Sequence, residues 1–294
     1  MHDIVMKFEV PLITRKADWD GRELVEGWDS ARAHRYMEAL KREVAANAGE
    51  FGDCRVTAIR WGGGIASMAN AQDIAEVMRL VRRGFAVADE APVSLEAAIA
   101  NISGASMPFL KRAGVTRFDF EMMSLFPKGY SLVNTRENLG DLPVICDYFL
   151  HAASRDNLGI VLLYGYAGTD GENFRRSVVE FLRTPAVHLR LVRAAGPKAA
   201  DDGIAEAQLA RARAILAEGG FAEYAPGTFA KPGFEDPVLA AERDRAPQIG
   251  FGLGALTRCE GAESLTTRDF ETYVAHSGDF TRITEAASAL PAVA

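Results

Sequence analysis

Residues 55–80 read RVTAIRWGGGIASMANAQDIAEVMRL, an apolar strand-like run that ends in three glycines and continues as a helical pattern. In its second half, apolar residues recur at spacings of 3, 4 and 7, which predicts a helix with one apolar face against a sheet. These residues are Ile74, Val77, Met78 and Val81. The stretch therefore predicts a strand, a glycine corner formed by Gly62, Gly63 and Gly64, and a helix.

The same alternation of strand and helix repeats along the chain. Strand-like runs occupy residues 4–12, 55–61, 91–96, 116–122, 158–165 and 186–192. Helical patterns occupy residues 30–47, 71–83, 98–113, 141–154, 171–183 and 203–218. Six strand–helix units in series predict an α/β fold with a parallel sheet inside and helices outside, either a barrel or a doubly wound sheet. Chemistry is then expected in the loops at the C-terminal strand ends.

Composition restricts the class of protein. The 294 residues are 48% hydrophobic, enough for one main domain with a substantial core. The net charge of -7 is spread without a basic block, so neither nucleic acid nor an anionic membrane is expected as a partner. The first residues lack a signal-peptide pattern and no run of 18 apolar residues occurs, so we expect a soluble, cytoplasmic protein. Cys54, Cys146 and Cys259 are too far apart for a disulfide framework or a metal-ligand spacing.

The glycine corner does not match a phosphate-binding motif. It lacks the Gly-Lys-Ser/Thr ending of a phosphate loop, and its spacing differs from the dinucleotide fingerprint. Glycine at this position allows unusual backbone angles and a close approach of a ligand to the backbone. By itself the corner fits a tight strand-to-helix turn as well as a ligand contact.

Six segments in the same order resemble the oxygen-independent coproporphyrinogen III oxidase family and its heme-chaperone relatives, which are radical S-adenosylmethionine (SAM) proteins. They are WGGGIAS (61–67), VSLE (93–96), FLKRAGVTRFDFEMMS (109–124), LLYGYAGTDGENFRRSV (162–178), GGFAEYAPGTFAKPG (219–233) and QIGFGLGALTR (248–258). The resemblance implies an incomplete (β/α)6 TIM-like barrel over residues 1–219 and a short extension over residues 220–294 packed on it. It also implies SAM binding inside the C-terminal mouth of the barrel.

The first strand departs from the family pattern. The family carries Cys-x-x-x-Cys-x-x-Cys there, three thiolates for a four-iron four-sulfur cluster that holds SAM. Here the stretch is VPLITRKADWDG (10–21), and the three cysteine places hold Ile13, Ala17 and Asp20. Isoleucine and alanine cannot ligate iron, and one carboxylate replaces soft thiolates poorly. We therefore expect no iron–sulfur cluster and no reductive cleavage of SAM to a radical.

Part of the SAM site that the resemblance implies is retained. Gly62, Gly63 and Gly64 match the glycines that line the methionyl amino group, and Glu96 matches the acid that closes the third strand. A carboxylate that caps the strand–helix junction is the structural alternative for Glu96. Ser124 is kept, while Arg136 lies one residue from the place of a family arginine that meets the SAM carboxylate. Two other contacts are lost, because Met123 replaces a glutamine and Val161 replaces an aspartate.

SAM without an iron remains an electrophile, so polar chemistry is expected: cyclisation or elimination with release of methylthioadenosine, or alkyl transfer. A base in a dry pocket could be a carboxylate or a tyrosine. Asp18 and Asp20, in the loop that replaces the cluster loop, are candidates for this base or for holding the amino group. A solvated charged loop is the alternative for both. Tyr164, at the end of the fifth strand, is a further acid or base candidate or a structural residue.

Three functions remain open. The first is a non-radical SAM-dependent lyase or transferase in specialised metabolism, with a small-molecule or carrier-protein-bound substrate. The second is an inactive binding module related to heme chaperones, and the third is a radical enzyme whose cluster is bound in another way. Arg117, Asp119 and Glu121 share a strand face by alternation and are expected to form an interior salt bridge. His188, on the sixth strand, is interpreted as a core residue, with a catalytic role as the alternative. The charged segment 234–247 speaks against porphyrin-related substrates.

Overall fold

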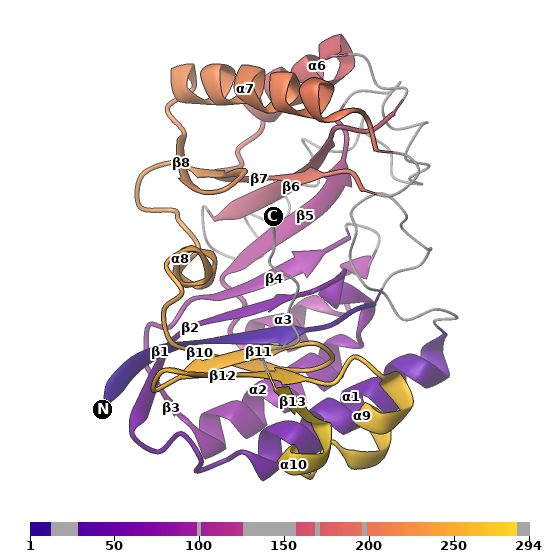
Figure 1. Cartoon of the computed structure of the whole chain (residues 1–294), viewed down its shortest axis with the longest axis vertical. Coiled ribbons are helices and arrows are strands. Elements are labelled where there is room, and N and C mark those ends of the chain that lie inside the picture. Colours follow the sequence, from indigo (N-terminus) through magenta and orange to yellow (C-terminus); the bar gives the residue numbers. More distant parts are fainter. Residues whose placement is uncertain (13–28, 99–100, 126–156, 168–170, 196–198, 287–294) are drawn as a thin grey trace.

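The computed structural model describes residues 1–12, 29–98, 101–125, 157–167, 171–195 and 199–286. Six strands lie side by side and run parallel in chain order, as the sequence predicts. They are β1 (His2–Glu9), β2 (Cys54–Gly62), β4 (Val93–Ala97), β5 (Arg117–Met123), β6 (Leu158–Tyr164) and β7 (His188–Arg193). A two-residue strand, β3 (Ala86–Val87), pairs with β2. The curved sheet and its connections define the α/β architecture (Figure 1).

Helices cover the outer face of the sheet (Figure 1). They are α1 (Ser30–Ala46), the one-turn η1 (Ala66–Met68), α2 (Ala71–Gly84), α3 (Met107–Ala113), α6 (Gly171–Phe181) and α7 (Asp202–Glu218). Helix α2 begins where the Asn70 side chain accepts a hydrogen bond from the Gln72 amide. Its predicted apolar face is confirmed, because Ile74, Val77 and Met78 are fully buried.

One predicted helix is shorter than expected, and another lies outside the described residues. Of the helix expected over 98–113, Met107–Ala113 is α-helical, whereas residues 102–106 are not helical. Ser103 and Ser106 exchange hydrogen bonds between their side chains and backbones, which holds a turn in place of helix. The helix expected over 141–154 lies outside the described residues.

Residues after 219 extend the same sheet at both edges. At one edge, β8 (Ala222–Ala225) and β9 (Thr228–Ala230) form a hairpin, and β9 pairs antiparallel with β7. At the other edge, β10 (Gln248–Phe251) pairs parallel with β1 and leads into β11 (Leu256–Cys259), β12 (Ala262–Thr266) and β13 (Thr284–Ala286). Helices α9 (Phe270–His276) and α10 (Phe280–Ile283) lie beside α1 in Figure 1. Strands β1 and β7 are thus each covered by a new strand.

Alternation along each strand separates an apolar outer face from a charged inner face. Phe8 and Trp61 stack on the outer face with ring centroids 4.2 Å apart, under the helices. Lys7 and Arg60 alternate with them and point to the inner face. Helix α8 (Pro237–Arg243) packs on that inner face near the start of β1 and β2, where Val5 contacts its residues. Within the described ranges, every helix is too short or too polar to span a bilayer.

Candidate functional site

The glycine corner lies directly against the end of strand β1. The Val10 amide donates a hydrogen bond of 2.6 Å to the Gly62 carbonyl, and the Ile65 amide donates one of 2.9 Å to the Leu12 carbonyl. A Cβ atom on Gly64 would lie 2.6 Å from the Val10 carbonyl oxygen, so backbone would have to move. The corner is therefore glycine-rich because two backbone segments meet there without room for side chains.

Two carboxylates converge on this corner. A Cβ atom on Gly62 would lie 3.1 Å from Oε1 of Glu96, at the end of β4. Gly63 has a φ of +81°, and its Cβ would lie 2.1 Å from Oε2 of Glu9, at the end of β1. The missing side chains of Gly62 and Gly63 thus leave space that carboxylate groups fill.

Glu96 belongs to a largely buried ion-pair network. Its Oε1 lies 2.7 Å from Nη2 of Arg60 and 2.8 Å from Nη1 of Arg190. Nη1 of Arg60 reaches Oδ2 of Asp119 and Oδ2 of Asp236, each at 2.7 Å. Because the side chains of Arg60, Glu96, Asp119 and Asp236 are at most 2% exposed, water screens these charges little.

His188 and Tyr224 complete the network on the far side of Asp119. Nε2 of His188 lies 2.8 Å from the Tyr224 hydroxyl, and Nδ1 lies 3.3 Å from Oδ1 of Asp119. Burial lowers the pKa of His188, although Asp119 opposes this effect. Burial acts to raise the pKa of Asp119, but His188 and Arg60 hold it well below its usual value. The network thus holds an ionised aspartate in the interior.

A second ion-pair group lies on the inner face beside Glu9. Nζ of Lys7 is 2.7 Å from Oε1 of Glu9 and 2.6 Å from Oε1 of Glu242 on helix α8. The three side chains are 18% to 30% exposed, so solvent reaches this group more than it reaches Arg60 and its carboxylate partners.

The structure brings together some of the predicted site residues. Gly62, Gly63, Gly64 and Glu96 form one cluster at the C-terminal end of β2 and β4. Ser124 follows β5, and its hydroxyl lies 3.1 Å from the Ser177 hydroxyl of helix α6. The remaining cofactor candidate, Arg136, and the candidate bases Asp18 and Asp20 lie outside the described residues, as do Ile13 and Ala17.

Tyr164 lies on the outer side of the sheet. Its ring centroid is 6.3 Å from that of Phe174 on helix α6, and it packs against the main apolar core. Burial raises the pKa of its hydroxyl, and the charges of Arg193 and Arg213 oppose that effect. The glycine corner faces the opposite side of the sheet, so the structure does not bring Tyr164 to it.

The expected burial of Arg117, Asp119 and Glu121 is confirmed. The ion pairs that the structure shows run to other elements, since Asp119 pairs with Arg60 and Arg117 lies 3.9 Å from Asp236. His188 is fully buried.

Sequence reasoning missed the partners of these residues. Arg60 and Arg190 gave no motif, although strand alternation places both on the inner face. Asp236 precedes Pro237 at the start of α8, a recognisable helix N-terminus. Glu9 and Lys7, two residues apart on β1, alternate with buried apolar residues and could have been placed on the inner face for that reason.

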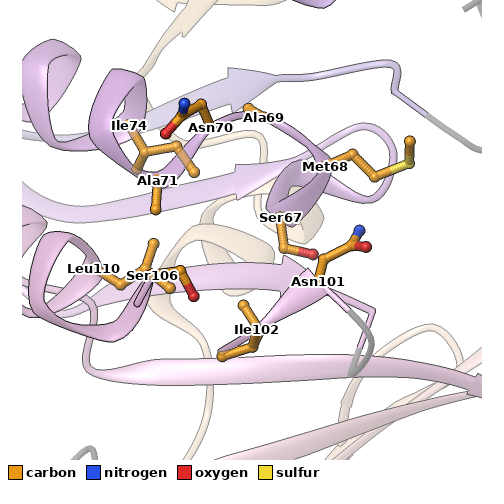
Figure 2. Close-up of a pocket in the computed structure, with 10 residues that line it drawn as sticks. All are labelled: Ser67, Met68, Ala69, Asn70, Ala71, Ile74, Asn101, Ile102, Ser106 and Leu110. Carbon is orange, nitrogen blue, oxygen red and sulfur yellow. The ribbon is translucent and has the colours of Figure 1, made fainter. Parts of the chain in front are cut away.

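Two cavities lie away from the glycine corner. One, of about 300 Å³, lies between η1, α2 and α3, where Figure 2 shows Ser67, Asn101 and Ser106 around one space. Its lining contains no charged side chain. The other, of about 200 Å³, lies at the N-terminal strand ends and is lined by Ser94, Arg117 and Asp236 among others. Among the residues that the structure describes, no group of three or more His, Cys, Asp or Glu is arranged to hold a metal ion.

Comparisons with known proteins agree with this fold. No family model matches the chain. An oxygen-independent coproporphyrinogen III oxidase of Salmonella typhimurium is 26% identical over 235 residues, which cover 72% of this chain and 49% of the relative. The heme chaperone HemW of Mycobacterium tuberculosis is 24% identical over 235 residues, which cover 75% of this chain and 60% of the relative. The chain thus spans about half the length of the first of these relatives and somewhat more of the second.

A solved structure shows the same architecture. Coproporphyrinogen III oxidase from Escherichia coli, described as a radical SAM enzyme, superposes with a TM-score of 0.79 at 18% identity, covering 97% of this chain and 72% of that one. The predicted resemblance and fold class are thereby confirmed. The comparisons do not test the loss of the cluster cysteines or the predicted site residues.

Proposed function

We propose that this protein is an enzyme that binds SAM at the glycine corner and uses it in a polar reaction, without an iron–sulfur cluster. The observation that carries the proposal is the corner itself. Gly62, Gly63 and the carboxylate of Glu96 lie together at the C-terminal strand ends of a fold shared with a radical SAM enzyme. Active sites of barrel folds lie at this end.

The residues present do not fit a cluster at this corner. The sequence contains three cysteines and no Cys-x-x-x-Cys-x-x-Cys motif. Cys54 begins β2, whereas the glycine corner follows the end of that strand, and Cys259 ends β11. Ile13 and Ala17 have no ligating atom. We therefore derive no electron transfer to the ligand.

The residues do fit the amino acid end of SAM. Carboxylate groups lie against Gly62 and Gly63 at this corner, and a carboxylate favours an ammonium group. Ser124 and Arg136 are proposed as further ligand contacts. When bound, SAM would supply a sulfonium centre whose carbon substituents are electrophilic.

Asp20 or Asp18 is proposed as the base. In an elimination, this base takes a proton from the carbon next to the one bonded to sulfur, and methylthioadenosine leaves with the electron pair of the broken bond. In a cyclisation, Cα or the amino nitrogen of the aminobutyryl arm gives a proton to the base and forms a bond to the carbon attached to sulfur, whose bond to sulfur breaks, so that methylthioadenosine leaves with that electron pair. In an alkyl transfer, a second substrate accepts the alkyl group and gives up a proton. That substrate is proposed to be a small molecule or a group on a carrier protein.

One observation favours a second function, a binding module without catalysis. The Glu96 carboxylate already lies between Arg60 and Arg190, which neutralise its charge. A heme chaperone is among the relatives. In this case SAM would bind without turnover, or not at all.

The deciding experiment combines iron analysis, calorimetric titration with SAM and mass spectrometry of the products. We expect little iron, measurable binding, and methylthioadenosine or S-adenosylhomocysteine as products. Asp20→Ala should remove the product, while Glu271→Gln, an exposed change on helix α9, should not. About four iron atoms per chain together with 5′-deoxyadenosine would contradict both functions. Binding of SAM without any product would favour the binding module.

A further inference from the structure

We propose that Glu9 is the residue that binds the cationic end of the ligand at the glycine corner, and that Lys7 is the positioning residue that holds its carboxylate there. The chemical class recognised is an ammonium or sulfonium cation. The identity of the ligand as SAM rests on the proposed function, whereas the cation preference of Glu9 does not.

Glu9 lies at the corner itself. It is paired with Gly62 in the register of β1 and β2, and its Oε2 occupies the space that a Cβ on Gly63 would need. The Tyr36 hydroxyl donates a hydrogen bond to the Glu9 carbonyl, which anchors the backbone. The carboxylate is thus presented from a rigid strand end, an arrangement that limits the entropy lost when a ligand binds.

Among the residues that the structure describes, one oxygen of this carboxylate has an ion-pair partner. Oε1 lies 2.7 Å from Nζ of Lys7. Among the described residues, Oε2 accepts no hydrogen bond and has no ion-pair partner within 4 Å. Lys7 thereby turns one carboxylate oxygen inward and leaves the other at the corner as an acceptor.

The charges of the two ion-pair groups differ. The network around Arg60 contains three arginines and three carboxylates, so its described charges balance; these are Arg60, Arg117, Arg190, Glu96, Asp119 and Asp236. The group around Lys7 contains one ammonium and two carboxylates, Glu9 and Glu242. The negative charge left over by these pairs therefore lies beside Glu9, not at Glu96.

Glu9 is the better placed of the two carboxylates for a ligand. Glu242 lies on helix α8 and is 30% exposed, so water solvates its carboxylate more than that of Glu9. Glu9 is 18% exposed and lies at the end of β1, with its Oε2 against Gly63. A less hydrated carboxylate gains more from a cation, because the interaction is less screened.

The test is calorimetric titration of the full chain and of Glu9→Gln with three ligands. SAM carries an ammonium and a sulfonium group, S-adenosylhomocysteine carries the ammonium alone, and methylthioadenosine carries neither. We expect Glu9→Gln to bind SAM at least about tenfold more weakly, since a charge-assisted contact is lost, and to bind methylthioadenosine within about twofold of the unaltered protein. An equal loss with S-adenosylhomocysteine would assign the contact to the ammonium, and a loss with SAM alone to the sulfonium.

Glu242→Gln is the matched control, because it removes an equal charge from the same lysine, whereas Glu9 is the carboxylate that lies against Gly63. The affinity of Glu242→Gln for SAM should fall by clearly less than that of Glu9→Gln. Unchanged affinity of Glu9→Gln for SAM, an equal loss for methylthioadenosine, or an equal loss in Glu242→Gln would each overturn the inference.

A second measurement separates this inference from the proposed function. If the unaltered protein binds none of the three ligands, the proposed function fails, and the cation preference is then tested with propylammonium against propanol as a neutral match. We expect propylammonium to raise the thermal unfolding midpoint of the unaltered protein more than that of Glu9→Gln, and propanol to show no such difference. Equal shifts in the two proteins would overturn the role of Glu9.

Discussion

Glu43, a fully buried carboxyl on helix α1, links that helix to the C-terminal part of the chain. Its Oε2 accepts hydrogen bonds from the Tyr273 hydroxyl at 2.7 Å and from the Gly252 amide at 2.9 Å. Burial raises the pKa of Glu43 from 4.5 to about 7, although these hydrogen bonds oppose the effect. Glu43 is thus protonated in the folded protein at pH values where it is ionised in the unfolded chain.

We expect Glu43→Gln to flatten the dependence of stability on pH. The pKa of Glu43 is higher in the folded protein than in the unfolded chain. The stability that protonated Glu43 contributes is therefore fully present below pH 4.5 and is lost as pH rises to about 7. The loss is on the order of 3 kcal/mol in the free energy of unfolding. Urea unfolding at several pH values between 4.5 and 8 measures it.

The control for this series is Glu271→Gln. Glu271 is exposed and pairs with Arg35, and a hydrogen bond from Arg35 lowers its pKa, so its contribution is lost at falling and not at rising pH. If Glu43→Gln shows the same fall in stability between pH 4.5 and 7 as the unaltered protein, the role given to Glu43 is wrong.

At the scale of elements, Asp236 both caps helix α8 and binds it to the strands. Oδ1 of Asp236 accepts hydrogen bonds from the Val238 and Leu239 amides at the start of the helix. Oδ2 accepts hydrogen bonds of 2.7 Å from Arg60 and from Ser94. A seven-residue helix has little stability of its own, so this carboxylate sets where α8 lies against the strands.

We expect Asp236→Asn to destabilise the protein by about 3 kcal/mol, because it leaves a buried arginine with one carboxylate fewer. The matched control is Asp269→Asn. Asp269 caps the equally short helix α9 through the Thr272 amide but is solvent-exposed and has no arginine partner among the described residues. Chemical denaturation of both variants decides the matter: equal losses would mean that capping, and not the buried ion pair, dominates at Asp236.

At the scale of the whole molecule, residues beyond 219 cover the two edges of the six-stranded parallel sheet. Strand β9 covers β7, and β10 covers β1. Asp236 also reaches into the interior from this part of the chain. A barrel that ended at residue 219 would expose two sheet edges and leave Arg60 with fewer partners.

We therefore expect residues 1–219, expressed alone, to aggregate or to unfold without a cooperative transition. Circular dichroism during thermal unfolding, with the full chain as reference, measures this. A cooperative transition of the fragment at a temperature near that of the full chain would instead show that residues 1–219 form an independent domain.

Much of the fold could be predicted from the sequence because its signals are local. The six strands lie within a few residues of their expected bounds, and the apolar spacing of residues 74–81 predicted the buried face of α2. The helix over 98–113 was overestimated, because the Ser103–Ser106 turn depends on side-chain hydrogen bonds that apolar spacing does not report. For the candidate site, the sequence predicted the glycines and Glu96 but not Glu9 or Lys7.

By itself, the sequence determined the order of strands and helices, the place of the glycine corner after the second strand, and the absence of the cluster motif. Each of these follows from residues that are neighbours along the chain. Only the tertiary structure decided which charges meet. Arg60 and Asp236 are 176 positions apart and pair at 2.7 Å, and Lys7 reaches Glu242 across 235 positions. The Arg60–Asp236 pair forms because burial of both groups removes water as an alternative partner, a condition that exists only once the strands and helix α8 have packed around them.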